Sequence, residues 1–260
     1  MMEIFETAAL EAGKAILAIH RRGPTTRYKT DCSPVTEADE RAEEIILAHL
    51  SGAFPEIPVV AEESVAAGRI PSIAGRSFIL VDPLDGTKEF VNRHDDFTVN
   101  IALIEEGRPV AGIVYAPARN VAYIGSRDGA YRLRIAADFE VVERSPIHVR
   151  EAGNLSVAVA SRSHNSPQTE EFLRKAGIHD TCLIGSSLKF CLVAEGQADL
   201  YPRFSRTMEW DTAAGDAVLR AAGGSTVTPD GVPLAYGKTR QADDADFANP
   251  HFIAYGSKPG

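Results

Sequence analysis

Val81-Asp82-Pro83-Leu84-Asp85-Gly86-Thr87-Lys88-Glu89-Phe90 is the stretch that decides how this chain folds and what chemistry it can carry. It sets two carboxylates, Asp82 and Asp85, three residues apart, around a proline and before a Gly-Thr pair. The apolar run 77–81 leads into it and predicts a buried strand. A strand that ends in this way can direct both carboxylates, a backbone carbonyl and the Thr87 hydroxyl at one point.

Such a set of oxygens suits a hard divalent cation such as Mg²⁺. Gly86 lets backbone N–H groups approach an anion closely, as a phosphate site requires. The competing interpretation is an ordinary surface turn, because Asp, Pro and Gly are common turn residues. Further acidic motifs elsewhere in the chain favour the first interpretation.

The composition limits the class of protein. The chain has 260 residues, enough for one large domain or two closely packed halves. Lys plus Arg is 27 and Asp plus Glu is 36, which gives a formal charge of -9. This balance disfavours binding to a nucleic acid polymer, which needs a basic surface. It does not disfavour a small anionic substrate, because a bound metal can invert the local sign of charge.

Cysteines and hydropathy give the expected compartment. Cys32, Cys182 and Cys191 form no paired spacing, so neither a disulfide framework nor a zinc site is predicted. Cys182 and Cys191 have apolar neighbours and are expected in the core. No apolar run approaches the length of a membrane span, and the acidic N-terminus has no secretory pattern. We therefore expect a cytoplasmic protein without membrane insertion.

Periodicity predicts helices that flank sheets. In the first half, helices are expected over 3–21 and about 37–51, and strands over 57–61, 77–82, 97–104, 110–115, 121–124 and 130–133. Thr36 and Asp39 have the spacing of a capping box at the start of the second helix. In the second half, strands are expected over 155–160 and 198–201, and helices over 169–176, 187–195 and 211–222.

The polar segment near 136–152 is the predicted seam between two halves, 1–150 and 151–260. The hairpin-forming strands of the first half indicate a sheet that is partly antiparallel. Layered α and β structure therefore fits better than a pure βαβ repeat.

Four more carboxylates are candidates for chemistry, and each has a plainer interpretation. Glu62 and Glu63 follow the strand predicted at 57–61, but adjacent glutamates are usually a solvated loop. Asp211 follows Trp210 and can instead be the N-cap of a helix. Asp39 can be no more than a capping-box partner. Carboxylates that converge repel one another, and two or three Mg²⁺ ions would resolve that conflict and activate a water for phosphate ester hydrolysis.

The chain resembles the inositol monophosphatase superfamily, a group of lithium-sensitive, magnesium-dependent phosphatases. The two segments that carry this resemblance are Asp82-Pro-Leu-Asp-Gly-Thr87 and Trp210-Asp-x-Ala-Ala-Gly-Asp216. Within the superfamily the chain is most similar to bacterial 3′(2′),5′-bisphosphate nucleotidases of the CysQ type. The segments that indicate this branch are 85–90, 97–103, 161–164, 185–196 and 201–203. The segment 62–68 instead resembles the inositol phosphatase branch.

The resemblance implies an α/β/α/β/α sandwich and a role for each matching residue. The implied metal ligands are Glu62, Asp82, Asp85, Asp211 and the Leu84 carbonyl. Thr87 would hold the attacking water, Asp39 would accept a hydrogen bond from Thr87, and Glu63 would act through an outer-shell water. The implied substrate contacts are the backbone of Gly86, Thr87 and Lys88, the metal ligand Asp211, and the side chains of Ser186, Lys189, Arg203 and His164.

The expected activity is Mg²⁺-dependent removal of the 3′-phosphate from adenosine 3′,5′-bisphosphate, with a metal-activated water as nucleophile. The products would be AMP and phosphate, 3′-phosphoadenylyl sulfate would be a second substrate, and lithium would inhibit. The reaction would recycle a by-product of sulfur assimilation. The alternatives are an inositol monophosphatase or broad-specificity sugar phosphatase with the same metals, and a non-catalytic nucleotide-binding protein. A homodimer is left open.

Overall fold

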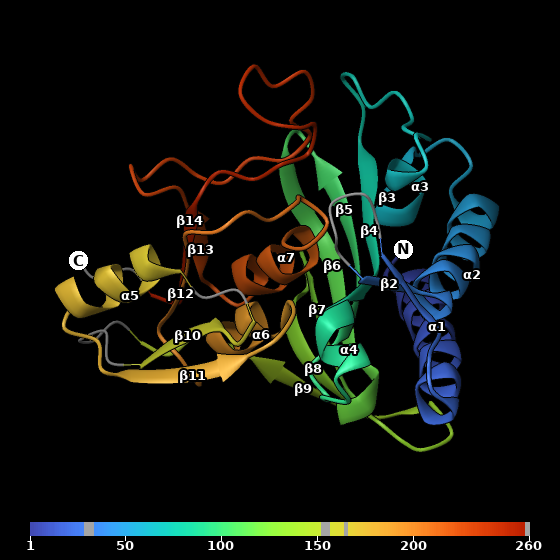
Figure 1. The fold of residues 1–260 in the computed structure, drawn as a ribbon, viewed down its shortest axis with the longest axis horizontal. Coiled ribbons are helices and arrows are strands. Elements are labelled where there is room, and N and C mark those ends of the chain that lie inside the picture. Colours follow the sequence, from blue (N-terminus) through green and yellow to red (C-terminus); the bar gives the residue numbers. More distant parts are fainter. Residues whose placement is uncertain (29–33, 152–156, 164–165, 258–260) are drawn as a thin grey trace.

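The computed structural model describes residues 1–28, 34–151, 157–163 and 166–257. Five layers stand side by side in Figure 1: a helix pair, a large sheet, a second helix pair, a smaller sheet and a single outer helix. This is the α/β/α/β/α arrangement that the sequence resemblance predicts. Within these described residues, no helix has the length and apolar character needed to cross a bilayer.

The first layer is a pair of amphipathic helices, α1 (Met2–Arg22) and α2 (Glu37–Ala53). Their apolar faces pack on the large sheet and bury Phe5, Ile16 and Ile46 completely. The predicted capping box at the start of α2 is confirmed, because Thr36 accepts from the Ala38 N–H and its own N–H donates to Asp39. A short pair of strands, β1 (Thr26–Tyr28) and β2 (Pro34–Thr36), lies between the two helices in the chain.

The large sheet has seven strands in sequence order, from β3 to β9. They are β3 (Val59–Ala61), β4 (Phe78–Asp85), β5 (Thr98–Glu105), β6 (Arg108–Ala116), β7 (Val121–Ser126), β8 (Gly129–Ile135) and β9 (Val141–Ile147). Only the first pair is parallel. Short helices α3 (Glu62–Ala66) and α4 (Thr87–Val91) follow β3 and β4, and the 3₁₀ helix η1 (Pro117–Arg119) follows β6.

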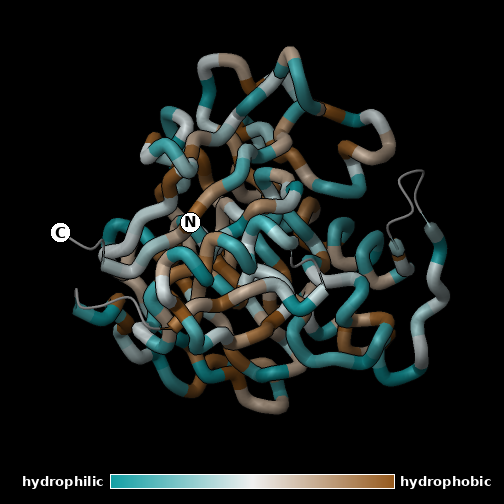
Figure 2. Tube along the Cα trace, turned by 60° about the vertical axis from the view of Figure 1, so that its left-hand side comes forward, coloured by the Kyte–Doolittle hydropathy of each residue, from teal (hydrophilic) through white to brown (hydrophobic). Residues whose placement is uncertain are grey.

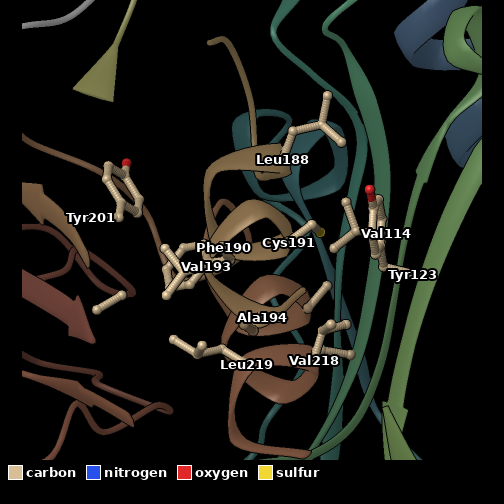
Figure 3. Close-up of a cluster of buried hydrophobic side chains, with 14 of the residues drawn as sticks. Val114, Tyr123, Leu188, Phe190, Cys191, Val193, Ala194, Tyr201, Val218 and Leu219 are labelled. Carbon is tan, nitrogen blue, oxygen red and sulfur yellow. The ribbon is translucent and has the colours of Figure 1, made fainter. Parts of the chain in front are cut away.

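The central helix layer consists of α6 (Leu188–Ala194) and α7 (Ala213–Ala221), which lie between the two sheets. Cys191 of α6 points toward Val114 of the large sheet, whereas the ring of Phe190 packs edge-on against Tyr201 on the other side (Figure 3). Helix α7 lies so close to the large sheet that a Cβ on Gly125 would come within 2.5 Å of the Val218 Cα. Glycine at this position therefore permits the packing of helix on sheet.

The smaller sheet has the strand order β11-β10-β12-β14-β13. Its members are β10 (Val157–Ser161), β11 (Asp180–Ile184), β12 (Leu200–Arg203), β13 (Ser225–Val227) and β14 (Phe252–Tyr255). Helix α5 (Pro167–Lys175) forms the outer layer, where Leu173 packs with Leu200 and Ile253. Hydrophobic and hydrophilic residues alternate along much of the chain, as expected when helices and strands bury one face (Figure 2).

The polar segment near 136–152, predicted as the seam between the two halves, contains the edge strand β9, most of whose residues are exposed or partly exposed. Two expectations from the sequence are wrong. Cys182 is exposed rather than buried, since it lies on the edge strand β11; Cys191 is buried as predicted, and Cys32 lies outside the described residues. The last predicted helix begins at Ala213, so its N-cap is Thr212 and not Asp211.

Candidate active site

The end of β4 places the first carboxylates. The pairing of β4 with β5 is regular up to Asp82 opposite Asn100 and is interrupted before Asp85, which lies opposite Thr98. The Leu84 N–H donates to Asp82 Oδ1 at 3.0 Å, so the Asp-Pro-Leu-Asp segment folds back on itself at the strand end. Asp82 is buried and Asp85 is partly accessible. Both residues line the same cavity.

Carboxylates from three separate segments meet beside this strand end. Oxygens of Glu62, Asp82 and Asp211 all lie within 4.8 Å of one another. Asp85 is adjacent and accepts a hydrogen bond from the Ser187 hydroxyl at 3.0 Å. The Met208 N–H donates to Asp211 Oδ2 at 2.8 Å and so holds the carboxylate that the sequence left open as a helix cap.

The electrostatics of this cluster favour a cation. Burial and the neighbouring carboxylates hold the pKa of Asp82 well above its usual range. Burial, Asp85 and Glu62 together raise the pKa of Asp211 to about 8. Burial also raises the pKa of Asp85, with the nearby Lys189 ammonium opposing the shift. A set of hard oxygen ligands that repel one another is a fitting site for a divalent metal ion.

Thr87 and Asp39 form a second element of the site. Gly86 adopts a left-handed conformation, with φ of 91°, at the start of α4, and Thr87 follows it. The Thr87 hydroxyl lies 3.1 Å from Asp39 Oδ1 and 3.2 Å from the Leu84 carbonyl oxygen. Asp39 Oδ2 closes the capping box, so one carboxylate both caps α2 and accepts a hydrogen bond from Thr87. Burial raises the pKa of Asp39 to about 6, although hydrogen bonds from Thr36 oppose the shift.

Glu43, which the sequence analysis missed, fixes the segment that carries Glu62. It is a buried carboxylate on α2, and helix α3 has Ala61 at its N-cap with no side-chain cap of its own. The Glu63 N–H donates to Glu43 Oε2 at 2.8 Å, and the Ser64 hydroxyl donates to Oε1 at 2.7 Å. Glu43 therefore caps α3 from another helix and holds Glu62 in place. A carboxylate four residues after Asp39, on the apolar face of α2, was the available signal.

Replacing Glu43 by glutamine should weaken metal binding about tenfold, because partners behind the ligands set ligand geometry. Trp210, the only tryptophan, lines the cavity, so its fluorescence can follow a Mg²⁺ titration. The exposed neighbour Glu44, which pairs with Arg41 on the surface, supplies the control substitution Glu44→Gln. Equal Mg²⁺ affinity in Glu43→Gln and wild type would contradict the positioning role.

The second half of the chain completes the same cavity, which has a volume of about 630 Å³. Its lining includes most of the predicted site residues: Glu62, Asp82, Leu84, Asp85, Gly86, Thr87, Lys88, Ser186, Lys189, Arg203 and Asp211. Asp39 and Glu63 are not among the described residues that line the cavity. His164 falls outside the described residues.

Two buried cations stand in this cavity. Lys189 on α6 donates to the Ser186 carbonyl and lies 5.3 Å from the centre of the Tyr201 ring. Burial lowers the pKa of Lys189 to about 8, against the attraction of Asp85. Arg203 at the end of β12 donates to the Arg206 carbonyl, and its buried Nε has no hydrogen-bond partner among the described atoms. Cations held this way suit an anionic ligand.

Sequence reasoning also missed Ser187 and Asn100. The Ser187 hydroxyl lies 2.7 Å from the Asp211 carbonyl oxygen as well as 3.0 Å from Asp85, and Asn100 donates to it at 2.9 Å. These residues join β5, α6 and the segment before α7 around the carboxylates. Their small polar side chains carry no motif of their own, so the sequence offered only the adjacency of Ser187 to Ser186.

The model of the inositol monophosphatase family matches residues 1–253. The chain belongs to the inositol monophosphatase family. It is 44% identical to the 3′(2′),5′-bisphosphate nucleotidase CysQ of Salmonella typhimurium, over 97% of this chain and 98% of that protein. The corresponding enzyme of Escherichia coli K12 is also 44% identical, over 94% of this chain and 95% of that protein.

Solved structures of family members share the fold. The crystal structure of CysQ from Bacteroides thetaiotaomicron aligns with a TM-score of 0.79 and 37% identity, covering 98% of this chain and 97% of that chain. The extragenic suppressor protein SuhB from Bartonella henselae aligns with a TM-score of 0.77 and 26% identity, covering 98% and 93%. The layered α/β fold inferred from the sequence is thus the fold of this family.

Proposed function

We propose that this member of the inositol monophosphatase family is a Mg²⁺-dependent phosphatase that converts adenosine 3′,5′-bisphosphate to AMP and phosphate. The observation that carries the proposal is the single cavity that joins the carboxylate cluster to the buried cations Lys189 and Arg203. The carboxylates suit metal ions that act on the phosphate that is hydrolysed, and the two cations suit a phosphate that is only bound. The names of the nucleotidases that are 44% identical support the same substrate.

Glu62, Asp82, Asp85, Asp211 and the Leu84 carbonyl would hold two or three Mg²⁺ ions. Bound ions of this kind neutralise phosphate charge and lower the pKa of water near the scissile ester. The closeness of the carboxylate oxygens and the raised pKa of Asp82 support this ligand set. Asp211 would also contact the substrate, because it faces the same cavity.

Thr87 and Asp39 would orient the attacking water. The Thr87 hydroxyl donates its proton to Asp39 Oδ1, which leaves the Thr87 oxygen free to accept a hydrogen bond from a water. Backbone N–H groups of Gly86, Thr87 and Lys88, at the left-handed turn that begins α4, would hold the scissile phosphate. Glu63 would assist through an outer-shell water.

Ser186, Lys189, Arg203 and His164 would bind the phosphate and nucleoside that remain. An ammonium and a guanidinium are suited to a phosphate that is bound without being cleaved. We further propose that residues 1–150 supply the metal and water-orienting groups, and that residues 151–260 supply the nucleotide contacts and the last metal ligand. 3′-Phosphoadenylyl sulfate is the proposed second substrate, in sulfur assimilation in the cytoplasm.

The proposal is tested by the products of the reaction. Adenosine 3′,5′-bisphosphate incubated with the protein and Mg²⁺ should give equal amounts of phosphate and 5′-AMP, separated by chromatography. EDTA should abolish the reaction, and lithium should inhibit it. Formation of 3′-AMP, or undiminished turnover in EDTA, would contradict the proposal.

Thr87→Val should lower kcat roughly 10²-fold, because it keeps the shape of the side chain but removes the hydroxyl that orients the water. Thr87→Ser keeps the hydroxyl and should retain most of the activity. Steady-state phosphate release measures both variants. A Thr87→Val protein as active as Thr87→Ser would remove Thr87 from the mechanism.

A further inference from the structure

Asp96, a buried carboxylate of the first half, holds two segments of the second half. It lies just before β5 and is 1% exposed. Its Oδ2 accepts from the Gly185 N–H at 2.5 Å, and its Oδ1 accepts from Arg162 Nη1 at 3.1 Å. These partners follow strands β11 and β10, the two strands at one edge of the smaller sheet. One side chain therefore ties that edge to the layer that carries the metal ligands.

Glu89 makes a parallel connection from α4. It is 3% exposed, lines the cavity, and its Oε1 accepts from the Ser163 hydroxyl at 2.5 Å. Ser163 directly follows Arg162, so the two carboxylates hold neighbouring residues. The contacts of both side chains are hydrogen bonds to a carboxylate, which are stronger than hydrogen bonds between neutral groups.

The contact at Gly185 leaves no free space. A Cβ on this residue would lie 2.7 Å from the Glu89 Cγ and 2.8 Å from the Asp96 carbonyl oxygen. The next residue, Ser186, adopts a positive φ of 53° and lines the cavity. Its carbonyl in turn accepts the hydrogen bond from the Lys189 ammonium. Asp96 is thus connected, through Gly185 and Ser186, to the Lys189 ammonium, which would bind the phosphate that is not cleaved.

We propose that Asp96 is a positioning residue that determines affinity for the uncleaved end of the substrate. The inference rests on the proposed function and adds a residue outside the metal cluster and outside the cavity lining. Asp96 acts through the backbone of 185–186, which sets where Ser186 and Lys189 meet the ligand. The hydrogen bonds of the Asp96 carboxylate go to Gly185 and Arg162 rather than to the proposed metal ligands or Thr87, so the hydrolytic step itself should not depend on it.

The test is the substitution Asp96→Asn, which keeps the shape but turns one acceptor into a donor facing other donors. KM for adenosine 3′,5′-bisphosphate should rise roughly tenfold, as expected when buried donors to a charged group lose their acceptor. The kcat and the Mg²⁺ concentration that gives half the maximal rate should change less than about twofold. Equal KM in Asp96→Asn and wild type would overturn the inference.

Asp199→Asn is the matched control. Asp199 also bridges an arginine and a backbone N–H, since it accepts from Arg150 and from Val157, the first residue of β10. Its KM should equal that of wild type, and an equal rise in both variants would show a general loss of structure and overturn the inference.

Arg162→Met is a second, milder variant, because Arg162 is partly exposed. The KM of this variant should rise about threefold. If Asp96→Asn does not fold, this result tests the inference in its place. A wild-type protein that left the bisphosphate intact would overturn the proposed function and this inference together. Wild-type activity with unchanged KM in both variants would overturn the inference alone.

Discussion

Replacing Asp82 by asparagine is expected to lower kcat by on the order of 10³-fold, comparable to the loss of a group that stabilises charge in the transition state. Asp82 is buried at the centre of the carboxylate cluster, and its oxygens lie within 4.8 Å of those of Glu62 and Asp211. An amide at this position removes one negative charge from the proposed ligand set without changing the shape of the side chain. Steady-state phosphate release at saturating Mg²⁺ measures the effect.

The same substitution should stabilise the metal-free protein, by about 1–3 kcal/mol, because it removes a buried charge beside like charges. Urea unfolding in EDTA gives the free energy of unfolding of both proteins. If Asp82→Asn loses activity but gains stability, Asp82 acts as a metal ligand. A residue with only a structural role would lose both. An Asp82→Asn protein that is fully active, or that is both inactive and less stable, would contradict the assignment.

Stability without metal should fall as pH rises from about 4 to about 8, and added Mg²⁺ should reverse the fall. Burial and mutual repulsion raise the pKa of Asp82 and Asp85, and they raise the pKa of Asp211 to about 8 from an ordinary value of 3.8. Between the unfolded and folded pKa values the folded protein binds more protons than the unfolded chain. The free energy of unfolding contributed by these groups is therefore full below about pH 4 and is lost as pH rises.

In the proposed function Mg²⁺ would bind the ionised carboxylates, so its stabilising effect should grow over the same pH range. Each unit of pKa shift corresponds to about 1.4 kcal/mol, which makes the difference between about pH 5 and pH 8 several kcal/mol. Thermal unfolding at these two pH values, with Mg²⁺ or with EDTA, measures it. In Asp211→Asn the pH dependence in EDTA should become shallower. A shift in Tm by Mg²⁺ that is equal at both pH values would contradict the linkage.

The sequence predicted those parts of the fold whose signals are local. Helices α1 and α2 follow from apolar spacing, and the capping box of Thr36 and Asp39 marks the start of α2 within a residue. Strands β4 to β8 were expected because they are apolar or joined by short turns. Edge strands β9 and β11 were not predicted, since exposed strands lack the apolar pattern on which the prediction depends.

In the candidate site, too, local features could be predicted from the sequence and long-range contacts could not. Asp82, Asp85 and Thr87 lie within six residues, a spacing compatible with a shared site or with a surface turn, and the acidic motifs elsewhere in the chain favoured the shared site. Asp96 and Glu43 have as partners Gly185, Arg162 and the Glu63–Ser64 segment, at separations of 20 to 89 residues. Nothing in the sequence distinguishes a buried carboxylate that caps a remote backbone from one that faces solvent.

The most direct test of the central claim compares kcat/KM for adenosine 3′,5′-bisphosphate with kcat/KM for inositol 1-phosphate at saturating Mg²⁺. The carboxylate cluster and the buried cations Lys189 and Arg203 line one cavity. Because buried cations need a second anion, we expect the protein to prefer the nucleotide by at least about 10²-fold. Lys189→Met should reduce this preference. A preference of the wild-type protein for inositol 1-phosphate would contradict the account of the second half of the site.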